Sequence, residues 1–367
     1  MLLVQIIVML LLLLGANGYV FFRLYQMLPP VLPLQILLIV LGVLLQLPIF
    51  VAMIWGNSLP TKLVSVLYQI GTSWIIIFVF LLTIFLLIDI FSVIKPLNIR
   101  QYMTHSWLAW GVLLGVVSLL LIFGNKTYYQ KKRVELNIKI DKPLAKPLKI
   151  VTISDLHIGY GIGKDELETW VSLINDEKPD LVLIAGDVID NDTKPLYEEK
   201  LYKTLRKLQT RHGVYMALGN HEYISRIDNS IEFLEKSNIT VLRDSAVLVD
   251  SAFYIVGRED ASRKYRNSLS NIVLGLDTTK PIIVLDHQPS GFEEAQQCGA
   301  DLLLSGHTHQ GQILPIKFIV KAMFKQSYGY HTANGTHFYV TSGLGIWGGK
   351  FRIGSRSEYV VIELEGK

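Results

Sequence analysis

The sequence predicts an all-α membrane domain followed by an α/β domain in which two packed mixed sheets are flanked by helices. Half of the 367 residues are hydrophobic and the mean hydropathy is positive, but the apolar excess lies before residue 125. After it, short continuous apolar runs alternate with helix-period segments, which is typical of buried strands in α/β units. Five short polar patterns stand at the ends of such runs between Asp155 and His309.

The N-terminal region is nearly free of charge, with Asp89 as its one acidic residue between residues 2 and 124. Crossing a bilayer takes about 20 apolar residues. Four stretches are long enough, roughly 2–22, 31–55, 67–94 and 107–124. We therefore expect an integral membrane domain of about four helices over residues 1–125. A signal peptide is the alternative for the first stretch, but no Lys or Arg precedes its apolar core.

The orientation follows from the basic residues in alternate loops. With a cytoplasmic N-terminus, Lys62 and four basic residues of the segment 126–133 lie inside, whereas Arg23, Lys95 and Arg100 lie outside. Five against three favours this orientation, and an even number of spans then puts the second domain in the cytoplasm at the cell membrane.

Asp89 lies near the end of the third stretch. A charged residue in a membrane helix is by default a functional candidate. The alternative is a position at the lipid headgroups, less than two helical turns before Lys95.

Residues 126–146 form a juxtamembrane segment. Its basic cluster, residues 126–133, is suited to anionic lipid headgroups. The sequence VELNIKID at 134–141 alternates apolar and polar residues, which predicts a half-exposed edge strand. The chain has no run of basic residues interleaved with aromatics, so nucleic acid is not an expected partner. The single cysteine, Cys298, excludes an intramolecular disulfide and agrees with a reducing compartment.

The second domain, residues 147–367, begins with helices and ends with strands. Apolar residues at helical spacing predict helices at 164–176, 195–209 and 229–236. Short alternating strands are expected at 240–257 and again from 312 onward. We therefore expect two sheets packed face to face with the helices outside.

The five polar patterns supply oxygen and nitrogen ligands at strand ends. They are DLH (Asp155, His157), GDVID (Asp187, Asp190), GNHE (Asn220, His221), DHQP (His287) and GHTHQGQ (His307, His309). Ligands of open α/β sheets collect where strands end, so these residues are expected to converge on one crevice.

The order of the five patterns resembles that of the calcineurin-like metallophosphoesterase superfamily, and the resemblance covers residues 147 to 367. The final segment, SGLGIWGGKFRIGSRSEYVVIELE, resembles the ending of the branch that is found as membrane-attached bacterial enzymes. The resemblance implies an αββα sandwich and hydrolysis of phosphate esters at two divalent metal ions.

The resemblance also implies which residues hold the ions. One ion would be bound by Asp155, His157, Asp187 and His309, and the other by Asp187, Asn220, His287 and His307. Carboxylates mixed with imidazoles suit Mn, Fe or Zn better than Ca or Mg. Two ions sharing Asp187 would lower the pKa of a bridging water, so that hydroxide is available for in-line attack on phosphorus.

His221 directly follows Asn220, and adjacent residues on an extended segment face opposite ways, so one of them has another task. In the family the matching histidine protonates the leaving group, and Asp190 resembles its orienting partner; these two are the catalytic candidates. Arg258 and Arg352 are candidates for binding the substrate phosphate, with a solvated surface position as the alternative.

The expected function is a membrane-anchored, dinuclear-metal phosphoesterase that hydrolyses a phosphate ester or pyrophosphate. The anchor would favour a lipid or lipid-linked substrate confined to the membrane, and membrane lipids are expected partners. The alternative is a non-enzymatic membrane sensor or scaffold that has kept the fold. Every matched ligand position is occupied in this sequence, which favours the enzyme.

Overall fold

The computed structural model describes residues 2–94 and 99–367, and it leaves out the side chains of residues 2–7, 9, 10 and 94. Lys95, one of the basic residues used to predict the orientation, lies outside the described residues. The chain divides into two compact units, Met1–Asn125 and Lys126–Lys367.

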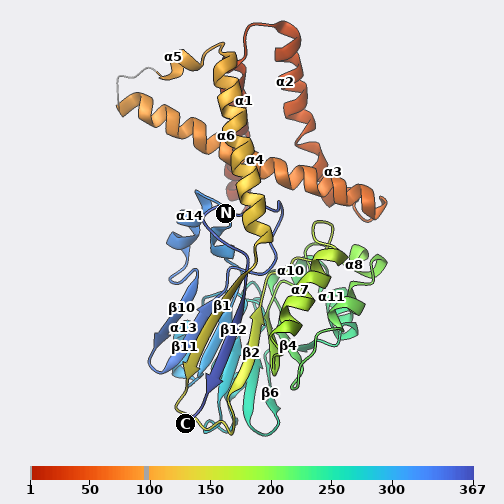
Figure 1. The fold of residues 1–367 in the computed structure, drawn as a ribbon, viewed down its shortest axis with the longest axis vertical. Helices are drawn as coiled ribbons and strands as arrows, with labels where there is room; N and C mark the ends of the chain where they lie inside the picture. The colour runs from red at the N-terminus through yellow and green to blue at the C-terminus, as the bar shows by residue number, and fades with distance from the viewer. Residues whose placement is uncertain (1, 95–98) are drawn as a thin grey trace. The chain divides into compact units, whose positions relative to one another are not determined.

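The first unit is all helical (Figure 1). Its helices are α1 (Leu2–Met27), α2 (Leu32–Leu44), α3 (Leu47–Trp55), α4 (Thr61–Ile94), α5 (Ile99–Met103) and α6 (Trp107–Tyr129), the last of which runs into the second unit.

Three helical segments among the described residues are long and apolar enough to cross a membrane: Leu32–Trp55, Thr61–Val93 and Trp107–Tyr129. Few of their side chains are buried within the protein, as expected for helices whose surface is covered by lipid. The predicted membrane domain is therefore present with three such spans. The first predicted stretch, 2–22, lies within α1 and is not among the three, so three of the four predicted spans are found among the described residues.

Asp89 is paired within the helical unit. Its Oδ1 lies 3.2 Å from the Arg23 guanidinium and 3.0 Å from Nε of Arg100, and the Tyr19 hydroxyl donates a hydrogen bond to Oδ2 at 2.7 Å. These contacts join α1, α4 and α5. The charge of Asp89 thus has partners inside the protein, and it needs no ligand to be accommodated.

The first sheet of the second unit has the order β1-β12-β2-β3-β4-β5. Its strands are β1 (Lys132–Lys139), β12 (Glu358–Glu365), β2 (Leu148–Ile153), β3 (Leu181–Ala185), β4 (Val214–Ala217) and β5 (Thr240–Leu242). Strands β2 to β5 are parallel, and β12 is antiparallel to β2. β1 is an edge strand, as predicted, but it begins two residues earlier than the alternating pattern.

The second sheet has the order β10-β11-β9-β8-β7-β6. Its strands are β10 (Gly329–Ala333), β11 (Thr336–Val340), β9 (Leu302–Ser305), β8 (Ile282–Leu285), β7 (Phe253–Gly257) and β6 (Ser245–Val249). Aliphatic side chains from both sheets, such as Ile150, Leu183, Ile283 and Leu304, form one buried cluster between the sheets. That cluster is the core of the predicted sandwich.

Helices cover the outer faces of the two sheets (Figure 1). Those after β2, β3 and β4 are α7 (Lys164–Asp176), α8 (Lys194–Glu198), α9 (Leu201–Leu205), α10 (Asn220–Ile224) and α11 (Ile227–Lys236). Those of the second half are α12 (Leu269–Val273), α13 (Phe292–Gln297), the 3₁₀ turn η1 (His309–Gly311) and α14 (Ile316–Met323). Two mixed sheets with outer helices confirm the predicted α/β class.

Two of the three helices predicted in the second unit are confirmed, and one is wrong. α7 matches the predicted 164–176 at both ends, and α11 begins two residues before the predicted 229. The single helix predicted at 195–209 is wrong, because the segment forms two short helices, α8 and α9. Lys200 separates them with a φ of 55°, a left-handed conformation that interrupts an α-helix.

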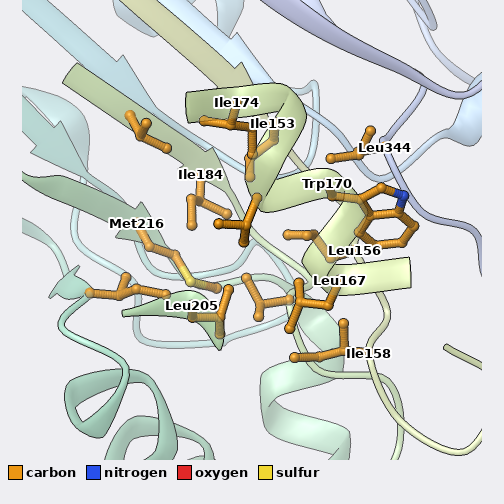
Figure 2. Packing of buried hydrophobic residues seen from close by; sticks show 14 of the residues in the cluster. Ile153, Leu156, Ile158, Leu167, Trp170, Ile174, Ile184, Leu205, Met216 and Leu344 are labelled. Carbon is orange, nitrogen blue, oxygen red and sulfur yellow. The ribbon is translucent and has the colours of Figure 1, made fainter. Parts of the chain in front are cut away.

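The outer core fixes the first ligand loop. Leu156 stands between Asp155 and His157 in the DLH pattern and is 1% exposed. Figure 2 shows it beside Leu167 and Trp170 of α7, in the cluster that covers the first sheet. With Leu156 anchored in this cluster, the loop backbone between the two ligand residues has little freedom to move.

Candidate metal centre

Five of the candidate ligands follow the ends of five strands within three residues. Asp155, Asp187, His287 and His307 are each the second residue after β2, β3, β8 and β9, and Asn220 is the third after β4. Because β2, β3 and β4 are parallel, and β8 is parallel to β9, the ligands of each sheet emerge at one edge. A hydrogen bond between Nδ1 of His287 and the carbonyl oxygen of Ala185, at 2.7 Å, joins the two edges.

The structure brings the predicted ligands together in three overlapping groups. The ligand atoms within each group all lie within 4.8 Å of one another. The groups are Asp155–His157–His309, His157–Asp187–His221 and Asp187–His287–His307. Asp187 is the carboxylate that two groups share among the described residues, which is the position predicted for a bridging ligand.

Individual distances agree with a compact site. Nε2 of His157 lies 3.2 Å from Nε2 of His309 and 3.8 Å from a carboxylate oxygen of both Asp155 and Asp187. Nε2 of His287 lies 3.1 Å from Oδ2 of Asp187. Nitrogen and oxygen lone pairs held this close, in a buried site, need a cation or protons between them.

The ligand loops have unusual backbone conformations. Asp155, His157, Asp187, His307 and His309 all have φ between 47° and 69°, the left-handed region that non-glycine residues rarely adopt. Conformations of this kind cost about 1–3 kcal/mol each and are concentrated at functional sites. The loops are therefore shaped for the placement of their side chains and not for local backbone stability.

Two glycines allow the loops to approach one another. Gly186 has a φ of 84°, and a Cβ built on it would lie 2.5 Å from Nδ1 of His287. A Cβ on Gly219 would lie 2.1 Å from Oδ1 of Asp187. Any side chain at either position would displace a candidate ligand.

The donor set fits a divalent metal. Oδ1 of Asn220 and Nδ1 of His309 are buried and find no hydrogen-bond partner among the residues that the structure describes. A buried polar atom without a partner is costly, and a coordinated cation would supply one. Carboxylate oxygens mixed with imidazole nitrogens are typical ligands of Mn, Fe and Zn.

The charges of the site also favour a cation. Burial raises the pKa of Asp187, but the adjacent His287 and His157 outweigh burial and lower it, so this carboxyl group is ionised. Burial lowers the pKa of His287, but the charge of Asp187 outweighs it and raises the pKa well above the usual value. Burial and His157 lower the pKa of His309 well below its usual value, so its imidazole is neutral. Asp187 thus attracts positive charge, and His309 has a lone pair to offer.

His221 and Asp190, the two catalytic candidates, lie beside the ligands. Nδ1 of His221 donates a hydrogen bond to the main-chain oxygen of Asp190 at 2.7 Å, and it lies 3.6 Å from Oδ1 of that residue. Oδ1 of Asp190 is also 3.5 Å from Nδ1 of His157. Sequence reasoning expected a carboxylate partner for His221, whereas its shortest contact is with the main chain. This contact fixes the proton on Nδ1 and leaves Nε2 for other contacts.

Glu222 organises the site, and sequence reasoning missed it. It is fully buried in GNHE, and its carboxylate accepts hydrogen bonds from the main-chain N–H groups of Asp187, Ile189 and Gly219 at 2.8–3.0 Å. It therefore ties the GDVID loop to the GNHE loop. Glu222 is part of the GNHE pattern, but the pattern does not indicate that its carboxylate accepts hydrogen bonds from the main chain.

Glu222 predicts a pH-dependent stability. Burial and the charge of Asp187 raise its pKa from 4.5 to about 7. Between these values the folded protein holds a proton that the unfolded chain has released, so the free energy of unfolding of the metal-depleted protein should fall as pH rises from 4.5 to about 7. Glu222→Gln should reduce this slope and destabilise the fold by about 1–3 kcal/mol, because one loop N–H loses its acceptor. Thermal unfolding of the detergent-solubilised chain across this pH range measures both effects.

The control for that experiment is Glu235→Gln, a change at an exposed glutamate of α11. It should leave the slope as in the parent protein. An unchanged slope in Glu222→Gln would contradict the role of Glu222.

Arg352 and Arg258 are not in the solvated positions that sequence reasoning left open. Arg352 is fully buried and donates hydrogen bonds to the carbonyl oxygens of Ser342, Gly345 and His309 at 2.7–3.2 Å. Arg258 is 3% exposed and pairs with Asp286. Both are held by the protein, so the prediction that they bind substrate phosphate has no support in these contacts.

The comparisons with known proteins agree with this site. Residues 148–311 match the family model of the calcineurin-like phosphoesterases. The chain is 34% identical to a metallophosphoesterase of Campylobacter jejuni over 69% of this chain and 68% of that protein. It is 33% identical to one of Aquifex aeolicus over 70% of this chain and 98% of that protein. It is 31% identical to a transmembrane protein with a metallophosphoesterase domain of Danio rerio, over 68% of this chain and 61% of that protein.

The fold and the site define a metal-dependent hydrolase of phosphate esters with apolar N-terminal helices. The chain belongs to the calcineurin-like metallophosphoesterases, and it is a membrane protein.

Proposed function

We propose that the protein is a membrane-anchored phosphoesterase that uses two divalent metal ions, with residues 147–367 as its catalytic domain. The observation that supports two ions is the position of Asp187, which belongs both to the group with His157 and to the group with His287 and His307. A carboxylate is the side chain that can hold two cations roughly 3.5–4 Å apart.

In this proposal the two ions have different ligand sets. Asp155, His157, Asp187 and His309 hold one ion, and Asp187, Asn220, His287 and His307 hold the other. Divalent ions in this position supply an activated water and neutralise the charge of the phosphoryl group. Mn, Fe and Zn all suit the mixed donor set.

We assign the protonation of the leaving group to His221. Its ring is 4.5 Å from the ring of His157, so it lies at the margin of the ligand groups. The Nδ1 contact with Asp190 orients the imidazole, and Nε2 is then the atom that would transfer a proton to the departing oxygen.

We further propose that the substrate is a lipid or lipid-linked phosphate ester. β1 is parallel to β12, which is antiparallel to β2, so β1 begins at the edge where β2 ends and Asp155 lies. Its first residue, Lys132, is only three residues after Tyr129, the end of the last apolar helix. The chain therefore enters the sheet at the edge that carries the ligands. The basic residues around 126–133 favour a cytoplasmic location at the cell membrane.

Metal analysis together with an aryl phosphodiester assay tests the proposed function. The purified full-length chain should contain about two divalent ions per molecule and should hydrolyse bis-(p-nitrophenyl) phosphate. Chelation should abolish turnover, and Mn²⁺ should restore it. Bound metal without turnover on any phosphate ester would instead support the sensor or scaffold alternative.

The substrate class is tested separately. The enzyme is incubated with a total lipid extract or with nucleotide-linked precursors in Mn²⁺ buffer, and mass spectrometry identifies the species that disappear. Asp187→Asn is the inactive control. Loss of only water-soluble esters would contradict the lipid-linked substrate while leaving the phosphoesterase activity intact.

A further inference from the structure

Helix α14 presents an apolar face to its surroundings. Leu314 is 38% exposed, Phe318 67%, Ile319 57% and Met323 71%. The spacing of Phe318, Ile319 and Met323 places them on one side of α14, and Leu314 precedes the helix by two residues. None of the eight residues of α14 is buried. A contiguous apolar face of this kind on a catalytic unit marks an interaction surface.

Basic residues accompany this face. Lys317 and Lys321 lie within α14, and Lys325 follows it. Nζ of Lys317 donates a hydrogen bond to the carbonyl oxygen of Gly354 at 2.6 Å. Lys325 pairs with Glu293, and both of these side chains are largely exposed. Lysines beside an exposed apolar face are the composition of helices that lie in a lipid–water interface. This charge complements an anionic lipid headgroup.

The helix is attached to the metal-binding loop. It follows η1, which contains His309, and a Cβ built on Gly311 would lie 2.4 Å from Cα of Lys317. The ring of Phe324, the residue after α14, contacts the ring of His307 at 6.0 Å between centroids. A shift of α14 would therefore change the positions of two candidate ligands, His307 and His309.

A cavity of about 370 Å³ lies between α14 and this loop. Its lining includes Gln310, next to His309, and the three lysines Lys317, Lys321 and Lys325. It is therefore a basic recess on the side of α14 that faces the loop of Gln310.

Helix α14 also lies at the end of the catalytic unit where β1 begins (Figure 1). That is the edge at which the chain enters the sheet, three residues after Tyr129. The apolar face of α14 is thus at the same end of the catalytic unit as the start of β1.

We propose that α14 is an interfacial lipid-binding helix of the catalytic unit. Its apolar face, Leu314, Phe318, Ile319 and Met323, enters the acyl region of the adjacent leaflet, and Lys321 and Lys325 contact anionic headgroups. This lipid contact is separate from the apolar N-terminal helices and does not depend on turnover. It holds the loop that carries His307 and His309 at the lipid surface.

The test places a fluorescent probe on the proposed face of the full-length chain. Cys298→Ala removes the native thiol, and Ile319→Cys then carries a polarity-sensitive fluorophore in nanodiscs that contain acyl-chain nitroxide lipids. Leu274→Cys is the matched control, since Leu274 is 82% exposed beside α12. The probe at 319 should be quenched several-fold more strongly than the probe at 274. Equal quenching at both positions would overturn the proposal.

Two further measurements distinguish lipid from a protein partner on this face. Nanodiscs of phosphatidylcholine alone are compared with an equimolar mixture with phosphatidylglycerol, which should increase quenching at 319. Lys321→Gln with Lys325→Gln should remove that increase. A probe at 319 that is shielded from water in detergent and is not quenched by nitroxide lipids would show a protein partner on this face and would overturn the proposal. Because the readout is independent of turnover, an inactive enzyme gives the same answer.

Discussion

Replacing Asp187 with asparagine should remove most of the bound metal and lower phosphodiester turnover on the order of 10³-fold or more. The carboxylate has its Oδ2 3.1 Å from Nε2 of His287 and 3.8 Å from Nε2 of His157, so it lies between the two proposed ion positions. An amide is neutral and offers only one ligand oxygen, so it neither bridges two cations nor offsets their charge. Elemental analysis gives the metal content, and the aryl phosphodiester assay gives turnover.

Asp301→Asn is the matched control for this substitution. Asp301 is also a buried aspartate, but it precedes β9, at the opposite end of the strand from His307. It accepts the N–H of Ile282 at 2.7 Å, which an asparagine oxygen can still do, and it loses the ion pair with Lys142. The control should keep its metal. A variant Asp187→Asn that kept the metal content and turnover of the parent protein would remove the bridging role.

The strands that carry the site were predictable because each is a continuous apolar run. Buried parallel strands need apolar side chains on both faces, so β2, β3, β8 and β9 stand out from the sequence without an alignment. A polar residue two positions after such a run then lies at the strand end. What the pattern could not give is that the ligands of two different sheets meet, because that depends on how the sheets pack.

The supporting residues were less predictable than the ligands. Glu222 and Arg352 are fully buried, although both are charged residue types that are mostly exposed in folded proteins. Their partners are mostly main-chain groups. Glu222 accepts the N–H of Asp187, for example, and Arg352 donates to the carbonyl oxygen of His309. Main-chain partners leave no trace in side-chain patterns, so sequence reasoning left Arg352 between substrate binding and the surface.

Helix breaks were missed for a similar reason. The segment 195–209 keeps helical spacing of its apolar residues across Lys200, and nothing in the residue type predicts the left-handed conformation there. In contrast, the break between α2 and α3 coincides with Pro48, the second residue of α3, a residue type that interrupts helices.

The second large effect is expected at His221, where alanine should leave the metal content unchanged and lower turnover of alkyl phosphate esters by roughly 10²–10⁴-fold. The imidazole is oriented by its 2.7 Å hydrogen bond to the main-chain oxygen of Asp190. Burial and the neighbouring His157 lower its pKa from 6.5, so the protonated form is favoured by acidic solution. Loss of a general acid matters most when the leaving group is a poor one, because an alkoxide needs a proton to depart.

The choice of substrate therefore separates a general acid from a ligand. With a nitrophenyl ester, whose leaving group departs without a proton, His221→Ala should retain most of its turnover, and with an alkyl ester it should lose most. His212→Ala is the control, since His212 pairs with Asp250 by a 2.9 Å contact away from the ligand groups. Loss of metal in His221→Ala would make His221 a ligand, in line with its place beside His157 and Asp187. Equal losses on both esters at full metal content would leave His221 with a positioning role, because only proton donation depends on the basicity of the departing oxygen.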